Sequence, residues 1–138
     1  MKLEQRLRRL TPRERHEIIS MLKEMLEKDE AVVFAYLHGS FVEGSSVRDV
    51  DIAVWLRSGA DPLDYIVSRS LEMEQRLGLP VDIQVLNEAP IPFRYVVYTR
   101  GRLLTVKDEK LHDLQVAKTL LMYSDLKALR RKALGRPP

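Results

Sequence analysis

The sequence predicts an α/β domain in which a mixed β-sheet is flanked by helices. Apolar runs of strand length occur at residues 31–37, 49–56 and 81–86, and helical periodicity occurs around 12–28 and 62–77. Strands alternate every second residue or form short apolar runs, whereas amphipathic helices repeat every three to four residues. The order helix, strand, strand, helix, strand is typical of a sheet covered by helices.

The first helix is expected to begin at residues 11–14, where Thr-Pro-Arg-Glu has the form of a capping box with proline at the first helical position. The helix should end near Lys28 and Asp29. Its apolar stripe is formed by Ile18, Ile19, Leu22, Met25 and Leu26. The continuous apolar run Ala31 to Leu37 then predicts a buried strand.

The second helix is expected to begin at Asp61-Pro62 and to end at Gly78, which has the residue type of a C-cap. Leu63, Ile66, Val67 and Leu71 are expected to form its apolar side. Val81 to Leu86 follows as the third strand.

The C-terminal third is expected to hold an edge strand at 102–106 and a long helix from about Glu109, after a segment of undecided type at 93–99. In the long helix, one set of residues is expected to pack on the sheet: Leu111, Leu114, Ala117 and Leu121. A second set is expected to remain partly free for a partner: Leu120, Tyr123, Leu126 and Leu129.

Composition predicts one cytoplasmic domain spanning residues 1–138. The chain has no cysteine, which excludes disulfides, thiolate zinc sites and thiol nucleophiles. No apolar run reaches membrane-spanning length, and residues 1–6 do not read as a signal peptide. The net charge is only +3, and the basic residues after Lys127 are typical of a solvated helix end. Direct binding of nucleic acid is therefore not expected.

Two aspartates at alternate positions, Asp49 and Asp51, suggest a metal site. Residues i and i+2 of a strand point to the same face, so both carboxylates should point one way. Carboxylates this close repel one another unless a positive charge lies between them. Mg²⁺ is commonly held by one or two carboxylates together with substrate phosphates. The alternative is a hairpin with two solvated aspartates.

The Gly39-Ser40 turn ahead of the aspartates suggests a phosphate site. Glycine lets the backbone approach a phosphate closely, and the N–H groups of such a turn can bind an anion. The Ser40 hydroxyl adds a further donor. A phosphate site beside a carboxylate pair is typical of phosphoryl or nucleotidyl transfer.

Gly39-Ser40, Gly44 and the Asp49-x-Asp51 pair resemble the signature of the nucleotidyltransferase superfamily of DNA polymerase beta. The resemblance implies the nucleotidyltransferase fold and a third carboxylate on a neighbouring strand. Asp82 is the candidate, because it alternates with Val81, Ile83 and Val85.

The later part of the chain is similar to the antitoxins of HEPN–nucleotidyltransferase toxin–antitoxin pairs. The likeness rests on residues 81–90, Phe93-Arg94-Tyr95, Gly101 to Leu104 and a helix containing Tyr123-Ser124-Asp125. It implies transfer of AMP from ATP to a tyrosine of a HEPN ribonuclease toxin, with Mg²⁺, and association with that toxin or with a second copy.

On this resemblance, each motif residue has an implied role. Asp49, Asp51 and Asp82 hold Mg²⁺ and are catalytic, with Asp82 placed to accept the proton of the attacking hydroxyl. The nucleotide is bound by four further residues: Gly39, Ser40, Gly44 and Arg48.

The chain departs from the family pattern between Ser40 and Asp49, which are separated by only eight residues. Phe41-Val42-Glu43 stands where relatives often carry arginine, and Arg48 is expected to compensate in part. Two alternatives therefore stay open: an antitoxin that acts by binding alone, and a small-molecule nucleotidyltransferase. Near the motif, His38 and Trp55 are expected to be packing residues rather than ligands of phosphate and adenine.

Overall fold

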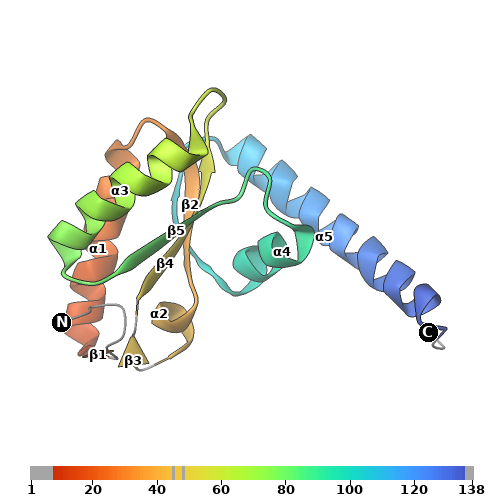
Figure 1. Ribbon diagram of the computed structural model, residues 1–138, viewed down its shortest axis with the longest axis horizontal. Coiled ribbons are helices and arrows are strands. Elements are labelled where there is room, and N and C mark those ends of the chain that lie inside the picture. Colours follow the sequence, from red (N-terminus) through yellow and green to blue (C-terminus); the bar gives the residue numbers. More distant parts are fainter. Residues whose placement is uncertain (1–7, 45, 48, 136–138) are drawn as a thin grey trace.

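The computed structural model describes residues 8–44, 46–47 and 49–135, and it has helices on both faces of one central sheet (Figure 1). The spatial order of the four strands is β5-β4-β2-β6. Their bounds are β2 Val32–His38, β4 Val50–Leu56, β5 Val81–Val85 and β6 Arg102–Val106. β2 is antiparallel to β4 and β6, whereas β4 and β5 are parallel, so the sheet is mixed as predicted.

Two pairs of helices enclose the sheet (Figure 1). α1 (Pro12–Lys28) and α3 (Pro62–Leu77) cover one face, and α4 (Ile91–Arg100) and α5 (Glu109–Ala133) lie against the other. The segment of undecided type is therefore helical. Three short elements lie at the end of the sheet where β2 finishes: α2 Ser40–Glu43, and the antiparallel pair β1 Arg8–Arg9 and β3 Ser46–Val47.

The sheet has one hydrophobic cluster on each face. Alternate residues of β4, namely Val50, Ile52 and Val54, are fully buried in the cluster beneath α1 and α3. The remaining β4 positions point toward α4, where Ala53 joins Phe34 in the second cluster. This alternation places Asp51 on the α4 face of the sheet.

The predicted helix boundaries are confirmed at α1 and α3. The Thr11 hydroxyl accepts from the Glu14 N–H at 3.1 Å, and the Glu14 carboxylate accepts from the Thr11 N–H at 2.9 Å, which completes a capping box. α3 begins after Asp61, whose carboxylate caps the Leu63 N–H, and it ends at Gly78 with φ 71°.

The predicted apolar side of α3 is wrong for three residues. Leu63, Val67 and Leu71 are 70, 53 and 57% exposed, whereas Tyr65 and Met73 are buried. The helix carries apolar residues on two sides, and Tyr65 fixes which side packs. Its neighbour Arg69 lies over the Tyr65 ring at 5.0 Å and pairs with Asp29 at the end of α1.

The predicted packing face of α5 is also wrong for three of its four residues, Leu111 being half-buried. Leu114, Ala117 and Leu121 are exposed, and the buried side of the helix centres on Thr119. The side of α5 that packs against the sheet carries His112, whose Nε2 lies 2.6 Å from the Tyr36 hydroxyl and whose ring stacks on the Tyr36 ring.

Further along α5, Tyr123 was expected to be partly free for a partner, but its ring stacks on Tyr95 of α4 with centroids 3.8 Å apart. Leu126 is half-buried, whereas Leu120 and Leu129 are exposed as predicted. The C-terminal half of α5 projects away from the body of the domain (Figure 1). Within the part of the chain that is described, no helix is both long and apolar enough to span a bilayer.

Candidate nucleotide and metal site

Polar side chains lie in a row across three neighbouring strands at one end of the sheet. His38 ends β2 and is the register partner of Asp51 at the start of β4, and Asp51 is in turn the partner of Asp82 in β5. Because paired residues of adjacent strands point to the same face, Asp51 and Asp82 are neighbours on the α4 face. Asp49 directly precedes β4. The structure thus brings together the three carboxylates selected from sequence.

The carboxylates interact electrostatically. The pKa of Asp51 is raised to about 6, first because the carboxyl is partly buried, and then because the charges of Asp49 and Asp82 disfavour a third negative charge. A hydrogen bond between the Asp51 and Asp82 carboxyls adds to the shift, because it favours the protonated form. Across the described residues, no three His, Asp or Glu side chains already stand at ion-binding distance, so the carboxylates would have to draw closer around a metal.

Gly39, in the turn before α2, lies against the Asp51 carboxylate. Its φ is +73° and its ψ is −149°, a conformation that only glycine adopts readily. A Cβ at this position would lie 2.4 Å from Oδ2 of Asp51. Gly39 therefore has a positive φ, and the nearest atom to a Cβ at this position would be the Asp51 carboxylate oxygen.

Ser40 follows with its hydroxyl oxygen buried and without a hydrogen-bond partner. A buried hydroxyl that lacks a partner is unfavourable by about 1–3 kcal/mol, so an acceptor from a ligand would stabilise it. The Gly44 N–H donates to the Ser40 carbonyl at 2.8 Å and closes the turn. Arg48, the other residue selected for nucleotide binding, lies outside the described residues.

Gln84 is a site residue that the sequence reasoning missed. Its Nε2 donates to Asp82 Oδ2 at 3.1 Å, and its Oε1 lies 2.9 Å from His38 Nε2. His38 also packs edge-on against Phe93 of α4, with ring centroids 5.6 Å apart. The signal was present in the sequence, because Gln84 lies two residues after Asp82 in a strand and must share its face.

Trp55 packs, as expected, in the core rather than at the nucleotide. Its ring stacks on Phe34 with centroids 5.6 Å apart and an interplanar angle of 18°. Trp55 lies on the same face of β4 as Asp51, but near the opposite end of the strand.

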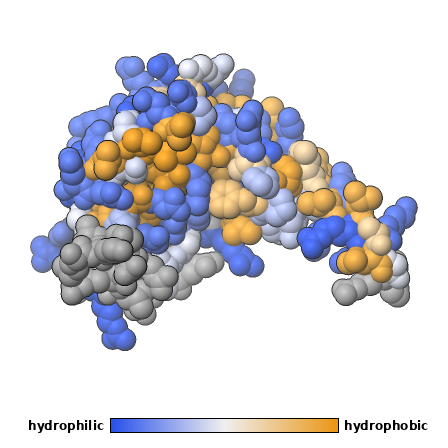
Figure 2. Space-filling view, in the orientation of Figure 1, coloured by the Kyte–Doolittle hydropathy of each residue, from blue (hydrophilic) through white to orange (hydrophobic). Residues whose placement is uncertain are grey.

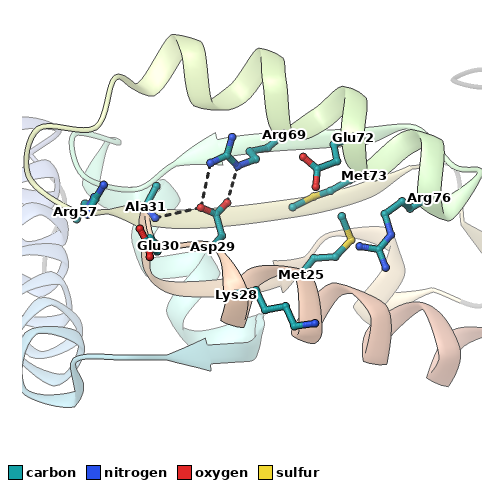
Figure 3. Close-up of a pocket in the computed structure, with 10 residues that line it drawn as sticks. All are labelled: Met25, Lys28, Asp29, Glu30, Ala31, Arg57, Arg69, Glu72, Met73 and Arg76. Carbon is teal, nitrogen blue, oxygen red and sulfur yellow. Dashed lines mark hydrogen bonds and ion pairs between the residues drawn. The ribbon is translucent and has the colours of Figure 1, made fainter.

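A pocket of about 550 Å³ lies at that opposite end and not at the carboxylates. Figure 3 shows Arg69 of α3 reaching across it to Asp29, with the Asp29 carboxylate also accepting from the Ala31 N–H. Lys28, Arg57 and Arg76 line its rim together with acidic residues. The Arg69–Asp29 pair joins α1 to α3, which is a structural role.

Comparison with known proteins identifies a family model that covers about two thirds of the chain. Residues 20–110 match the family model described as Polymerase beta, Nucleotidyltransferase. No curated protein matches the chain in sequence.

Three solved structures illustrate the likeness. A toxin–antitoxin with AMP-PNP is 27% identical, with a TM-score of 0.66, over 87% of this chain and 94% of that chain. A mutant toxin–antitoxin MntA–HpeT is 26% identical, with a TM-score of 0.68, over 83% and 91%. A tri-AMPylated Shewanella oneidensis HEPN toxin in complex with MNT antitoxin is 24% identical, with a TM-score of 0.68, over 87% and 94%, and at that identity it shows the shared fold.

Proposed function

Because the chain belongs to the polymerase beta nucleotidyltransferase family, we propose that it is a Mg²⁺-dependent antitoxin that transfers AMP from ATP to a tyrosine of a HEPN ribonuclease toxin. The observation that carries the proposal is the Gly39–Asp51 contact, which joins the glycine-serine turn to the carboxylates. The similar toxin–antitoxin with AMP-PNP supports the choice of an adenine nucleotide.

The carboxylates have the chemistry of a magnesium site. Three carboxylates are hard oxygen donors. The pKa of Asp51 is raised first by burial and then by repulsion from Asp49 and Asp82, and a divalent cation would relieve that repulsion. In the proposal, Asp49, Asp51 and Asp82 hold Mg²⁺. When bound, this ion would neutralise charge on the phosphates and stabilise the transition state.

The triphosphate would lie against the turn. Gly39 leaves room beside Asp51, and the Ser40 hydroxyl supplies a donor that has no partner within the described part of the protein. Gly44 closes this turn, and Arg48 is proposed to add positive charge from the segment that follows. Nothing larger than glycine fits at position 39 without moving Asp51.

In the proposed reaction, the tyrosine oxygen of the toxin attacks the α-phosphorus of ATP, the bond to the bridging oxygen breaks, and pyrophosphate leaves. The tyrosine proton passes to the Asp82 carboxylate, which is exposed and therefore accessible to a protein substrate. Gln84 donates to one carboxylate oxygen of Asp82 and so helps to orient this group.

The projecting half of α5 is proposed as the toxin-binding surface. Leu121, Leu129 and Leu134 are 69, 63 and 64% exposed, and hydrophobic side chains are visible along the projecting helix in Figure 2. Exposed apolar side chains that gather on one part of a surface are typical of a protein-interaction site. A second copy of the chain is the other occupant that the experiment has to consider.

The experiment is to mix the purified chain with a HEPN protein encoded beside it, Mg²⁺ and ATP, and to measure the intact mass of the HEPN protein. The proposal expects a mass gain of one or more AMP groups that maps to tyrosine. Asp51→Asn should abolish the gain, whereas Asp64→Asn, an exposed carboxylate on α3, should leave it unchanged.

The other outcomes decide between the alternatives. Complex formation without a mass gain would favour an antitoxin that acts by binding alone. The absence of a complex would contradict the antitoxin assignment. ATP-dependent modification of small hydroxylated or amino compounds by the chain alone would then favour a small-molecule nucleotidyltransferase.

A further inference from the structure

Arg15, near the start of α1, binds the backbone of the turn that follows Ser40. Its Nη1 donates to the Phe41 carbonyl at 2.8 Å, and its Nη2 donates to the Gly44 carbonyl at 2.5 Å. The guanidinium carbon lies 5.3 Å from the centre of the Phe41 ring. One planar side chain therefore makes three contacts with the segment 39–44, an arrangement that lysine cannot reproduce.

Arg15 binds the segment 39–44 at the protein surface, and the Phe41 ring anchors the same segment in the hydrophobic core. Phe41 is 3% exposed and belongs to the cluster beneath α1 and α3. Two backbone bonds also close the segment, from Val42 N–H to the Gly39 carbonyl and from Gly44 N–H to the Ser40 carbonyl. The position of the Ser40 hydroxyl in the turn beside Asp51 thus depends on a segment that Arg15 ties to α1.

The same segment lacks positive charge of its own. Between residues 39 and 47 the only charged side chain in the sequence is Glu43. A triphosphate carries several negative charges, so an acidic segment without a cation is unfavourable for it. The Arg15 side chain is a cation, and its guanidinium reaches this segment from another element of the fold.

We propose that Arg15 is a positioning residue that fixes the Gly39–Ser40 turn for a triphosphate and brings to it a positive charge that the segment itself lacks. The triphosphate part of this inference rests on the proposed function. The holding of the turn by Arg15 does not, and it can be measured without nucleotide.

The test uses Arg15→Ala, Arg15→Lys and the matched control Arg13→Ala. Arg13 lies on the same helix, its side chain is 90% exposed, and its guanidinium pairs with Glu17 one turn along that helix at 3.6 Å. Hydrogen exchange of residues 39–44 without nucleotide should be faster in both Arg15 variants and unchanged in Arg13→Ala, with the melting temperature of every variant recorded.

ATP binding is measured by calorimetry on the same proteins. Arg15→Ala should weaken binding about tenfold, because it loses two charge-assisted hydrogen bonds that hold the turn. Arg15→Lys should recover part of the affinity through its charge while exchange stays fast. This split separates the charge from the fixed geometry of the guanidinium, and a general loss of stability would not produce it.

The possible results separate the two proposals. Unchanged exchange in Arg15→Ala overturns the positioning role, whatever happens to ATP. Faster exchange with unchanged ATP affinity, or equal weakening in Arg13→Ala, overturns the part of the proposal that concerns the triphosphate. Failure of the unaltered protein to bind ATP overturns the proposed function instead, and the exchange measurement then still decides whether Arg15 holds the turn.

Discussion

Replacing Gly39 by alanine tests the central contact of the site. Gly39 has φ +73° and ψ −149°, and an added Cβ would lie 2.4 Å from Asp51 Oδ2. A non-glycine residue in this region is strained by about 1–3 kcal/mol. Displacing the carboxylate adds to that strain, so we expect Gly39→Ala to lower the free energy of unfolding by about 2–4 kcal/mol.

Gly78→Ala is the matched control. Gly78 has nearly the same φ, +71°, but no heavy atom lies within 4 Å of the position that a Cβ would occupy. Its substitution should lower the free energy of unfolding by only about 1 kcal/mol. At roughly 3–4 °C per kcal/mol for a chain of this length, the melting temperature should fall by about 10 °C in Gly39→Ala and by about 3–4 °C in Gly78→Ala.

The assay is thermal unfolding without nucleotide or metal, extended to the double variant Gly39→Ala/Asp51→Ala. Removing the Asp51 carboxylate should restore the part of the loss that comes from displacing that carboxylate, because the added methyl group then has space, whereas the backbone strain remains. This coupling can be read from a double-mutant cycle. Equal losses in Gly39→Ala and Gly78→Ala, with no coupling to Asp51, would refute the argument that Gly39 is required for contact with the carboxylate.

Three further predictions concern neighbouring features. The folded-state pKa of Asp51, about 6, lies above its ordinary value, so its contribution to stability is present below about pH 4 and is lost as pH rises through about 6. At pH 8 in EDTA, the free energy of unfolding of Asp51→Asn should therefore exceed that of the unaltered protein by about 1 kcal/mol, once solvent screening is allowed for. Urea unfolding that gives the two proteins equal free energies of unfolding would contradict this. Gln84→Leu should lower AMP transfer about tenfold without changing the melting temperature, because it frees Asp82, and full activity in a turnover assay would exclude that role. Leu121→Asp and Leu129→Asp should prevent complex formation with the toxin in size-exclusion chromatography while leaving the circular dichroism spectrum unchanged. An intact complex would show that the toxin binds another surface.

The sequence predicted the sheet and the Asp49–Asp51 pair because both depend on local periodicity, whereas Asp82 was selected through the family resemblance. The two-residue repeat predicted that Asp51 and Asp82 each point away from the apolar residues of their own strand, and the parallel register of β4 and β5 makes them direct neighbours. Gly39 could be assigned a special conformation because glycine is the residue type that such turns require. These inferences need no knowledge of distant contacts.

The packed faces of α3 and α5 were mispredicted because the orientation of each helix depends on long-range partners. In α5 the choice between a leucine side and a mixed side was decided by His112, which bonds to Tyr36 seventy-six residues away. In α3 it was decided by the Arg69–Asp29 pair, which spans forty residues. Apolar residues occur on both sides of each helix, so hydrophobic periodicity alone could not select the packed side.

The contacts of Arg15 also depend on long-range packing. They give a reason why the segment between Ser40 and Asp49 can depart from the family pattern without loss of the proposed function. The sequence around Gly39 contains Glu43 and no arginine before Arg48, which by itself argues against a triphosphate site. Arg15 is twenty-four residues earlier in the chain, and only packing of α1 against Phe41 brings its guanidinium to the turn. A charge that is missing from a motif can thus be supplied by a neighbouring helix, so the activity of a divergent chain has to be judged from the assembled site. The ATP affinity of Arg15→Ala is the measurement that tests whether the assembled site of this chain binds the nucleotide as proposed.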